Sequence, residues 1–305
     1  MTGLGTMIVV EIGGTAVKIG FAVAGQPDAF IRTFPTARIR EVDPVAALVR
    51  LVREASHAAE LEPEQAVVTV PGFIDTDFDR VLFAANVPEL NGRCLATELS
   101  SALGMAVQLE RDVVLQLLGE CRRGIAAGET HVLGIYFGTG IGAAYLADGT
   151  MFRGGGWALE LGHVPVHGEG RSLPGLRPDC LEVYASGRTL ASFAEVQRLP
   201  VGELFSAAPS RPGLQRQLDG LVRDQAFAVA SAISMLSPHV VVVGGGVVEM
   251  PDYPRDRLRE IIAEHVPLPQ SIRSLDIRWA VLGWQAAIWG AIDLTTVRAP
   301  EVRLS

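Results

Sequence analysis

Apolar runs that end in glycine-rich turns recur three times along this chain of 305 residues. Residues 8–15 (IVVEIGGT), 133–142 (LGIYFGTGIG) and 240–246 (VVVVGGG) each predict a buried strand followed by a tight turn. A turn of small residues lets backbone N–H groups approach phosphate oxygens, which a side chain would obstruct. A single turn of this kind is ordinary turn chemistry. Three in order, with an isolated acid, Asp112, between the first and the second, favour a nucleotide site.

The segments between these turns alternate between helical and strand patterns, which is typical of an α/β fold. The predicted helices are residues 44–59, 95–103 (ended by Gly104), 113–123, 214–236 (one long helix or two abutting helices) and 284–296, and the further strands are 66–70 and 106–109. Residues 154–188 are rich in glycine and proline and predict loops around short elements. The last helix is expected to pack back on the first domain.

The first two glycine turns resemble each other beyond the turn itself. Each is followed by a second apolar strand, at residues 20–25 and 143–149. This repetition predicts a duplicated α/β domain with a cleft between the copies, and a chance similarity of two hairpins is the alternative. The chain length also exceeds the usual size of one hydrophobic core.

Charge and cysteine content limit the classes of partner. With 26 basic and 34 acidic residues the net charge is −8, which opposes broad attraction to nucleic acid or to an anionic membrane surface. The most apolar region, residues 226–248, is interrupted by Ser237, Pro238 and His239, so it predicts helix, turn and strand rather than a membrane span. The three cysteines form no Cys-x-x-Cys pair, which suits a cytoplasmic location.

The motifs resemble those of the ROK family of sugar kinases (repressor, open reading frame, kinase), a branch of the actin-like ATPase superfamily, over almost the whole chain. Residues 11–18 are similar to the family's first phosphate loop, 137–142 to its second, 243–247 to its adenosine loop, 160–163 to its sugar-site signature and 282–291 to its C-terminal helix. Among its members the bacterial D-allose kinases look most similar. They too place Arg-Asp-Val at the catalytic acid and follow the third loop with Val-x-x-Met-Pro.

The resemblance implies duplicated actin-like ATPase (ribonuclease H-like) domains with an interdomain cleft. A small domain of residues 1–111 plus 285–305 would close on a large domain of residues 112–284. It also implies an ATP- and Mg²⁺-dependent kinase that phosphorylates the primary hydroxyl of a hexose, D-allose or a related aldohexose, and a homodimer, which is common in the family. Exclusion of water by closure would protect the transferred phosphoryl group.

The resemblance assigns roles to particular residues. Asp112 is the implied catalytic base, and its position at a strand end fits that role; capping of the next helix is the structural alternative, and both can hold. The implied nucleotide-site residues are Glu11 (also the implied Mg²⁺ ligand), Gly13, Gly14, Thr15, Lys18, Gly138, Thr139, Gly140, Gly244, Gly245 and Gly246, and the implied sugar-site residues are Gly72, Asn86, Arg111, Glu160, His163 and Glu182.

Four positions depart from the family pattern. Glu11 replaces an aspartate, Arg111 replaces an asparagine, and Leu159 replaces a glycine. The family's Cys-x-Cys-Gly-x-x-Gly-Cys zinc motif aligns with residues 173–180, where only Cys180 remains. With His163 that leaves two of four ligands, too few for a structural tetrahedral site, so we expect no zinc.

Three other functions are alternatives for this sequence. A sugar-responsive repressor would carry a DNA-binding region before the first strand, where only six residues precede Met7. A degenerate sugar-binding protein with little turnover is suggested by Glu11 and Leu159. A dinucleotide oxidoreductase is disfavoured because the 138–142 turn lacks the Gly-x-Gly-x-x-Gly spacing and opens a hairpin rather than a helix.

Overall fold

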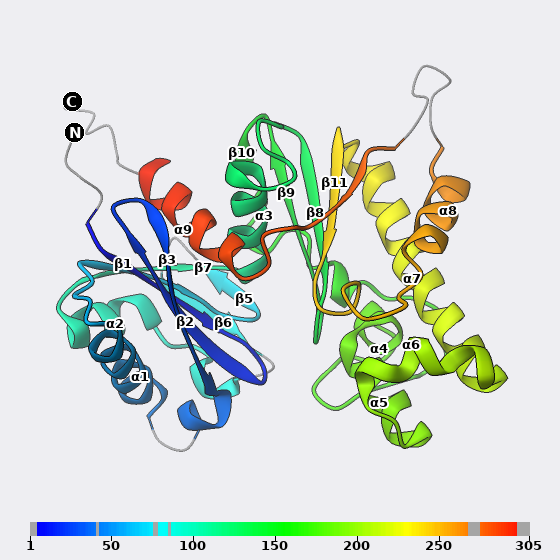
Figure 1. Cartoon of the computed structure of the whole chain (residues 1–305), viewed down its shortest axis with the longest axis horizontal. Coiled ribbons are helices and arrows are strands. Elements are labelled where there is room, and N and C mark those ends of the chain that lie inside the picture. The colour runs from blue at the N-terminus through cyan, green and yellow to red at the C-terminus, as the bar shows by residue number, and fades with distance from the viewer. Residues whose placement is uncertain (1–4, 41–42, 76–78, 85–86, 268–274, 298–305) are drawn as a thin grey trace. The chain divides into compact units, whose positions relative to one another are not determined.

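The computed structural model describes residues 5–40, 43–75, 79–84, 87–267 and 275–297, and the chain divides into two compact units (Figure 1). Unit 1 comprises Met1–Ala127, Arg153–Trp157 and Leu282–Ser305. Unit 2 comprises Gly128–Phe152 and Ala158–Val281. Each unit is therefore assembled from segments that lie far apart in the sequence.

Unit 1 is built on a five-stranded sheet with the order β3-β2-β1-β4-β7. The strands β1 (Met7–Ile12), β2 (Ala16–Val23) and β3 (Gln26–Pro35) are antiparallel, whereas β4 (Gln65–Thr69) and β7 (Ala106–Glu110) run parallel to β1. Nearly every side chain of β1 and β4 is buried, as expected for parallel strands covered on both faces. The carboxyl ends of β1, β4 and β7 meet at one edge, where Glu11, Thr69 and Glu110 are register partners.

The other elements of unit 1 are mostly helices. They are η1 (Thr36–Ile39), α1 (Pro44–Ala59), η2 (Pro88–Leu90), α2 (Leu95–Leu103), α3 (Asp112–Arg123), α9 (Gln285–Val297) and the small hairpin of β5 (Phe73–Asp75) and β6 (Arg80–Phe83). The helices α3 and α9 approach closely at two glycines. A Cβ on Gly119 would lie 2.0 Å from the Ala286 carbonyl oxygen, and one on Gly290 would lie 2.0 Å from the Leu115 carbonyl oxygen. Only glycine permits this backbone contact.

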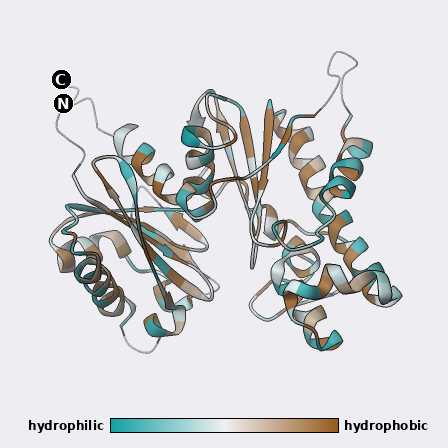
Figure 2. Cartoon of the chain, in the orientation of Figure 1, coloured by the Kyte–Doolittle hydropathy of each residue, from teal (hydrophilic) through white to brown (hydrophobic). Residues whose placement is uncertain are grey.

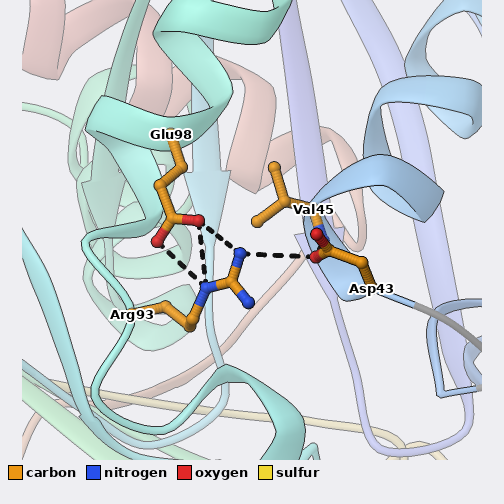
Figure 3. A network of polar contacts seen from close by, with 4 residues as sticks. All are labelled: Asp43, Val45, Arg93 and Glu98. Carbon is orange, nitrogen blue, oxygen red and sulfur yellow. Dashed lines mark hydrogen bonds and ion pairs between the residues drawn. The ribbon is translucent and has the colours of Figure 1, made fainter.

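A polar network links the starts of α1 and α2 (Figure 3). The Asp43 side chain accepts a hydrogen bond of 3.0 Å from the Val45 N–H and so caps α1, in which proline occupies the first position. Arg93 Nη2 lies 3.3 Å from the same Asp43 oxygen, and Arg93 Nε is 3.0 Å from both carboxylate oxygens of Glu98 on α2. One guanidinium group therefore ties two helix N-termini together.

Unit 2 repeats the sheet plan of unit 1 with the order β10-β9-β8-β11-β12. Its strands are β8 (Val132–Phe137), β9 (Ile141–Ala147), β10 (Thr150–Met151), β11 (Val240–Gly244) and β12 (Ile277–Trp279). The strands β8, β9 and β10 are antiparallel, and β11 and β12 run parallel to β8. In both units an antiparallel hairpin is thus followed by parallel strands, and the predicted duplication of an actin-like ATPase domain is confirmed.

Helices cover the strands of unit 2. They are η3 (Leu161–His163), α4 (Leu181–Ala185), α5 (Gly187–Gln197), η4 (Val201–Glu203), α6 (Leu204–Ala207), η5 (Ala208–Ser210), α7 (Pro212–Leu236) and α8 (Arg255–His265). Figure 2 shows hydrophobic colour along β8 and β11, and these strands share one buried core with α7.

Several predicted bounds agree closely with the structure. The helices at 44–59 and 95–103 have the predicted ends, α3 begins one residue earlier, and residues 212–236 form one helix rather than two. Helix α9 packs on α3 in unit 1. Residues 112–127 also belong to unit 1, whereas the sequence prediction placed the large domain from residue 112 onwards. Among the described residues, no helix is both long and apolar enough to cross a membrane.

Candidate active site

The first glycine turn joins β1 and β2 in unit 1. The Gly13 N–H donates to the Ala16 carbonyl over 2.8 Å, and a Cβ on Gly13 would lie only 2.9 Å from that same oxygen. The hydroxyl of Thr36 donates to the Gly13 carbonyl over 2.8 Å, and Arg40 Nη2 donates to the Gly14 carbonyl over 3.2 Å. The turn, which also includes the exposed Thr15, is thus held from outside by polar contacts to its carbonyls.

Two acidic side chains interact beside this turn. Glu11 stands at the end of β1, cross-strand from Lys18. Burial raises the pKa of Glu11, Lys18 lowers it, and the nearby charge of Asp112 raises it again. The structure therefore brings the predicted residues Glu11, Lys18 and Asp112 together in unit 1.

Asp112 is the first residue of α3 and follows the end of β7. Its Oδ1 accepts a hydrogen bond of 2.8 Å from the Val113 N–H. Burial is the main cause that raises the pKa of Asp112, although the residue keeps some exposure to solvent. The carboxylate is thus oriented by the Val113 N–H at the helix start and held in a poorly solvated place.

An ion pair that the sequence analysis missed lies next to Asp112. Glu110 is fully buried at the end of β7, and Arg153 donates to it from Nη1 and Nη2, over 3.0 and 2.5 Å. The N–H of the buried residue Arg111 donates to the same carboxylate over 3.0 Å. A fully buried acid at a strand end calls for a cation. Local sequence could not name it, because the partner lies 43 residues further along the chain.

Gly72 stands just before β5, with φ at +146°. A Cβ there would lie 2.0 Å from the Phe83 carbonyl oxygen, so the position requires glycine. The rings of Phe73 and Phe83 lie 5.9 Å apart, and that of Trp157 lies 6.4 Å from Phe73. Asn86, the other predicted sugar residue of this region, lies outside the described residues.

The second glycine turn joins β8 and β9 in unit 2. The Gly138 N–H donates to the Gly140 carbonyl over 2.9 Å. The N–H groups of Gly187 and Arg188, at the start of α5, donate to the carbonyls of Gly138 and Thr139 over 2.8 and 3.2 Å. The turn is therefore fixed by a helix that follows it by nearly fifty residues in the sequence.

Glu182 connects this turn to the sugar-signature segment. It is buried in the first turn of α4, and its Oε1 accepts a 2.7 Å hydrogen bond from the Ile141 N–H. A Cβ on Gly140 would lie 2.3 Å from the same oxygen, and one on Gly162 would lie 2.8 Å from Glu182 Cγ. Two glycines therefore make room for one carboxylate, which brings the predicted residues Gly140 and Glu182 together.

Glu160 and His163 flank a single turn of 3₁₀-helix, η3. The His163 N–H donates to the Glu160 carbonyl over 3.0 Å. Glu160 directly precedes the helix and His163 is its last residue, and the shared direction of their side chains stays a prediction.

The third glycine turn ends β11, beside the second. Gly244 is the register partner of Tyr136 on β8, and the Val247 N–H donates to the Phe137 carbonyl over 2.9 Å. Gly245 has a φ of +95°, and its Cβ would lie 2.5 Å from that carbonyl oxygen. Close parallel packing of β8 and β11 thus requires glycine and places the second turn and the Gly244–Gly246 turn at the same sheet edge.

Comparison with known proteins gives the family. The profile of the ROK family matches residues 7–298. The chain belongs to the ROK family.

Similar proteins agree with this assignment. A glucokinase of Thermotoga maritima is 25% identical over 312 residues, covering 96% of this chain and 98% of that protein. An N-acetyl-D-glucosamine kinase of Escherichia coli O157:H7 is 27% identical over 260 residues, covering 79% and 84%. The solved structure of a ROK family glucokinase from Streptomyces griseus, in complex with glucose and AMPPNP, superposes with a TM-score of 0.81 at 26% identity, covering 95% of this chain and 99% of that one. The predicted ROK sugar-kinase class is confirmed, whereas the likeness to allose kinases stays a prediction.

The ROK protein shows why one family position is usually glycine. Leu159 has a φ of +65°, in the left-handed region that glycine occupies without strain. Its carbonyl accepts a 2.7 Å hydrogen bond from the Leu161 N–H at the start of η3, and its side chain packs against the main core of unit 2. Here a hydrophobic contact offsets the backbone cost.

The family's set of zinc ligands is only partly present in this ROK protein. Among the residues that the structure describes, no group of three or more histidine, cysteine, aspartate or glutamate side chains could hold a metal ion. Cys180 is buried and precedes α4, where it acts as a helix-start residue. The residues present do not fit a tetrahedral structural zinc, which needs four ligands. Absence of zinc from the protein stays a prediction.

Proposed function

We propose that this ROK protein is an ATP-dependent hexose kinase in which Asp112 accepts the proton of the attacking primary hydroxyl. The observation that carries the proposal is the Asp112 carboxylate itself, which accepts the Val113 N–H at the start of α3 and whose pKa is raised by burial. A carboxylate with a raised pKa accepts a proton more readily than an ordinary one. Phosphoryl transfer needs this base, positioning of the reactants and neutralisation of charge.

Backbone groups support nucleotide binding in this proposal. The three glycine turns, at Gly13–Gly14, Gly138–Gly140 and Gly244–Gly246, stand at strand ends. At Gly13, Gly140 and Gly245 an added Cβ would lie less than 3 Å from a neighbouring atom, so each position favours glycine. Backbone N–H groups at such turns suit phosphate oxygens. Lys18, cross-strand from Glu11, would add a positive charge near the phosphates.

Magnesium fits the acidic pair of unit 1. Glu11 and Asp112 interact unfavourably, and burial raises the pKa of both. A divalent cation would relieve this repulsion, and Mg²⁺ is usually held by one or two carboxylates together with substrate phosphates. We assign Glu11 as the residue that would hold it. When bound, the metal would neutralise charge on the phosphates.

The proposed sugar residues belong to both units. In unit 2 they are Glu160 and His163 at η3 and Glu182 in α4. In unit 1 they are Gly72 and Arg111, and Asn86 lies outside the described residues. A carboxylate offers about four acceptor positions, so Glu182 can accept a sugar hydroxyl in addition to the Ile141 N–H. D-Allose, D-glucose and N-acetyl-D-glucosamine are the candidate substrates, the first from motif likeness and the others from the relatives' names.

A coupled assay of ADP release over this sugar panel tests the proposal. The protein with ATP and Mg²⁺ should release ADP in step with sugar phosphate, identified by mass spectrometry, for at least one aldohexose. Chelation of Mg²⁺ should stop the reaction, and its restoration should recover it. If calorimetry detects sugar binding while no sugar releases ADP, the degenerate sugar-binding alternative replaces the kinase.

We further propose that the protein is a cytoplasmic homodimer, as the family resemblance implies. Light scattering of the purified chain during size-exclusion chromatography measures its mass directly. A mass of about one chain at all protein concentrations would contradict the homodimer.

A further inference from the structure

The segment between η3 and α4 in unit 2 is a long irregular loop with a defined backbone. The Val166 N–H donates to the Asp179 carbonyl over 2.7 Å, and the Asp179 N–H donates to the Arg171 carbonyl over 2.8 Å. The Leu181 N–H donates to the Val164 carbonyl over 2.9 Å, which closes the loop at its base. The same loop includes residues 173–180, which align with the cysteine motif of the family. Only Cys180 of that motif is present here.

One carboxylate gathers this loop. Asp179 Oδ1 accepts hydrogen bonds from the N–H groups of Glu169 at 3.2 Å and Arg171 at 3.0 Å, and Oδ2 accepts from the Gly170 N–H at 2.8 Å. The Tyr184 hydroxyl on α4 donates to Oδ1 over 2.6 Å. These contacts, with Tyr184 first, hold the pKa of Asp179 below its ordinary value. We call Asp179 and these four donors the Asp179 cluster.

A second layer of side chains packs on the Asp179 cluster. The Arg171 guanidinium lies over the Tyr184 ring, 5.1 Å from its centroid, and the His167 ring lies 4.6 Å from the same ring. His167 Nε2 is 3.0 Å from an oxygen of Asp224, a buried residue on α7. The loop is thus joined to both α4 and α7 by polar and aromatic contacts.

The Asp179 cluster borders the proposed sugar residues on both sides along the chain. The loop begins just after His163, and the Asp179–Tyr184 hydrogen bond spans the first turn of α4, which contains Glu182. Glu182 in turn accepts the Ile141 N–H beside the second glycine turn. A shift of α4 would therefore move Glu182 relative to that turn.

We propose that Asp179 is a positioning residue that holds α4, and with it Glu182, in place for sugar binding, without a metal. The inference rests on the proposed kinase function. The described residues include no set of side chains that fits zinc. Instead, three backbone amides and one tyrosine hydroxyl all donate to Asp179 and hold the loop together. A displacement of about 1 Å in a binding group is enough to reduce function severalfold or more.

Steady-state kinetics of Asp179→Ala, Asp179→Asn and Tyr184→Phe test the inference. Asp179→Ala should raise the KM for the sugar on the order of tenfold, with the KM for ATP changed less than about twofold. Asp179→Asn keeps an acceptor oxygen and should fall between wild type and Asp179→Ala, and Tyr184→Phe, which removes one hydroxyl, should also raise the sugar KM. Asp219→Asn is the matched control, because Asp219 is exposed and accepts a hydrogen bond from Gln215 on its own helix, α7.

Hydrogen exchange and chelation separate this inference from the proposed function. The amides of residues 169–171 should exchange faster in Asp179→Ala than in wild type, a result that needs no turnover. A zinc chelator should change neither the exchange rates nor, once Mg²⁺ is restored, the sugar KM. An unchanged sugar KM, equal losses for sugar and ATP, or one tightly bound zinc per chain would overturn the inference. If the wild-type protein phosphorylates no sugar, the kinase proposal fails. Unaltered exchange at residues 169–171 in Asp179→Ala would separately show that Asp179 does not hold the loop.

If Asp179→Ala does not fold, circular dichroism will show it, and Tyr184→Phe carries the test. This variant removes a single donor and leaves the three amides on Asp179. A sugar KM equal to that of wild type in folded Tyr184→Phe would contradict the part of the inference that links the loop to α4.

Discussion

The two glycine hairpins share a plan but differ in their chemistry. The turn of β1–β2 in unit 1 and that of β8–β9 in unit 2 both follow a six-residue strand and precede an antiparallel partner. In the strand register Glu11 faces Lys18 in unit 1, whereas Tyr136 faces Gly142 in unit 2. A pair of charged residues thus flanks the turn of unit 1, whereas uncharged residues flank that of unit 2.

The acidic groups of the two units also differ in their partners. In unit 1 burial raises the pKa of Asp112, and it accepts one N–H at a helix start. In unit 2 Glu182 accepts an N–H from the second hairpin, and Asp179 accepts three amides and a phenol. A group that exchanges protons must keep capacity for its substrate, whereas a positioning group is saturated by the protein. The proposed roles therefore differ: Asp112 in unit 1 exchanges a proton, whereas Asp179 in unit 2 positions its neighbours.

Replacement of the base should have the largest effect on turnover. Asp112→Asn should lower kcat by at least about 10²-fold, because general-base catalysis contributes roughly 10²- to 10⁴-fold. Asparagine keeps an oxygen that can accept the Val113 N–H and nearly preserves shape, so sugar affinity by calorimetry should persist. Turnover close to that of wild type would remove the proposed role of Asp112 and the proposed division of roles with it.

Loss of the buried ion pair should have the largest effect on stability. Arg153→Met leaves the fully buried Glu110 without its bidentate partner, and we expect a loss of about 3 kcal/mol in the free energy of unfolding. Denaturant titration measures it. The control, Arg257→Met in unit 2, breaks an exposed pair with Glu260 and should cost less than about 1 kcal/mol. Equal losses in the two variants would show that burial of Glu110 is unimportant.

A methyl group at the second turn should disturb positioning in unit 2. Gly140→Ala would place its Cβ 2.3 Å from Glu182 Oε1, so the carboxylate must shift. We expect kcat/KM for the sugar to fall on the order of tenfold. Gly202→Ala, where a Cβ meets no described atom within 4 Å, is the matched control and should leave kcat/KM unaltered. A tolerated Gly140→Ala would mean that Glu182 need not stay in place.

The pH dependence of stability should distinguish the two acids by sign. Because burial raises the pKa of Asp112, folding is favoured below the unfolded pKa, and this contribution is lost as pH rises through the folded pKa. Asp112→Asn should therefore raise Tm relative to wild type at about pH 8, with a smaller difference near about pH 3. The lowered pKa of Asp179 gives the opposite sign, so Asp179→Asn should lower Tm at about pH 8. Tm shifts of the same sign in both variants would contradict the comparison.

The smallest expected effect is at the left-handed leucine. Leu159→Gly relieves about 1–2 kcal/mol of backbone cost but loses a partly buried side chain and adds unfolded-state entropy. These terms nearly offset, so the free energy of unfolding should change by less than about 1 kcal/mol. Denaturant titration would detect a larger loss, and that result would show that Leu159 contributes more packing than strain.

Local patterns were sufficient for much of the fold. Helix bounds at Pro44–Ala59 and Leu95–Leu103 agree with apolar spacing and with end signals such as Pro44 and Gly104, because these depend on neighbouring residues. The α/β class and the duplication were also predicted, because glycine turns at strand ends are visible in consecutive residues. The family was predicted from the resemblance of its motifs. The limits of the two units were not, because α3 packs on α9, more than 150 residues away by residue number.

For the candidate site, the sequence selected the residues that we propose to carry chemistry, and the tertiary structure decided how they are held. Asp112 at a strand end, Glu182 and the Glu160–His163 pair could be selected from motifs alone. The partners could not: Arg153 for Glu110, the Ile141 N–H for Glu182, and Tyr184 with three amides for Asp179. A side chain's partner is chosen by where the folded chain returns, and hydrogen bonds of about 3 Å act only after that return. Periodicity and spacing report on neighbours in sequence, so they are silent about contacts that only the packed units create.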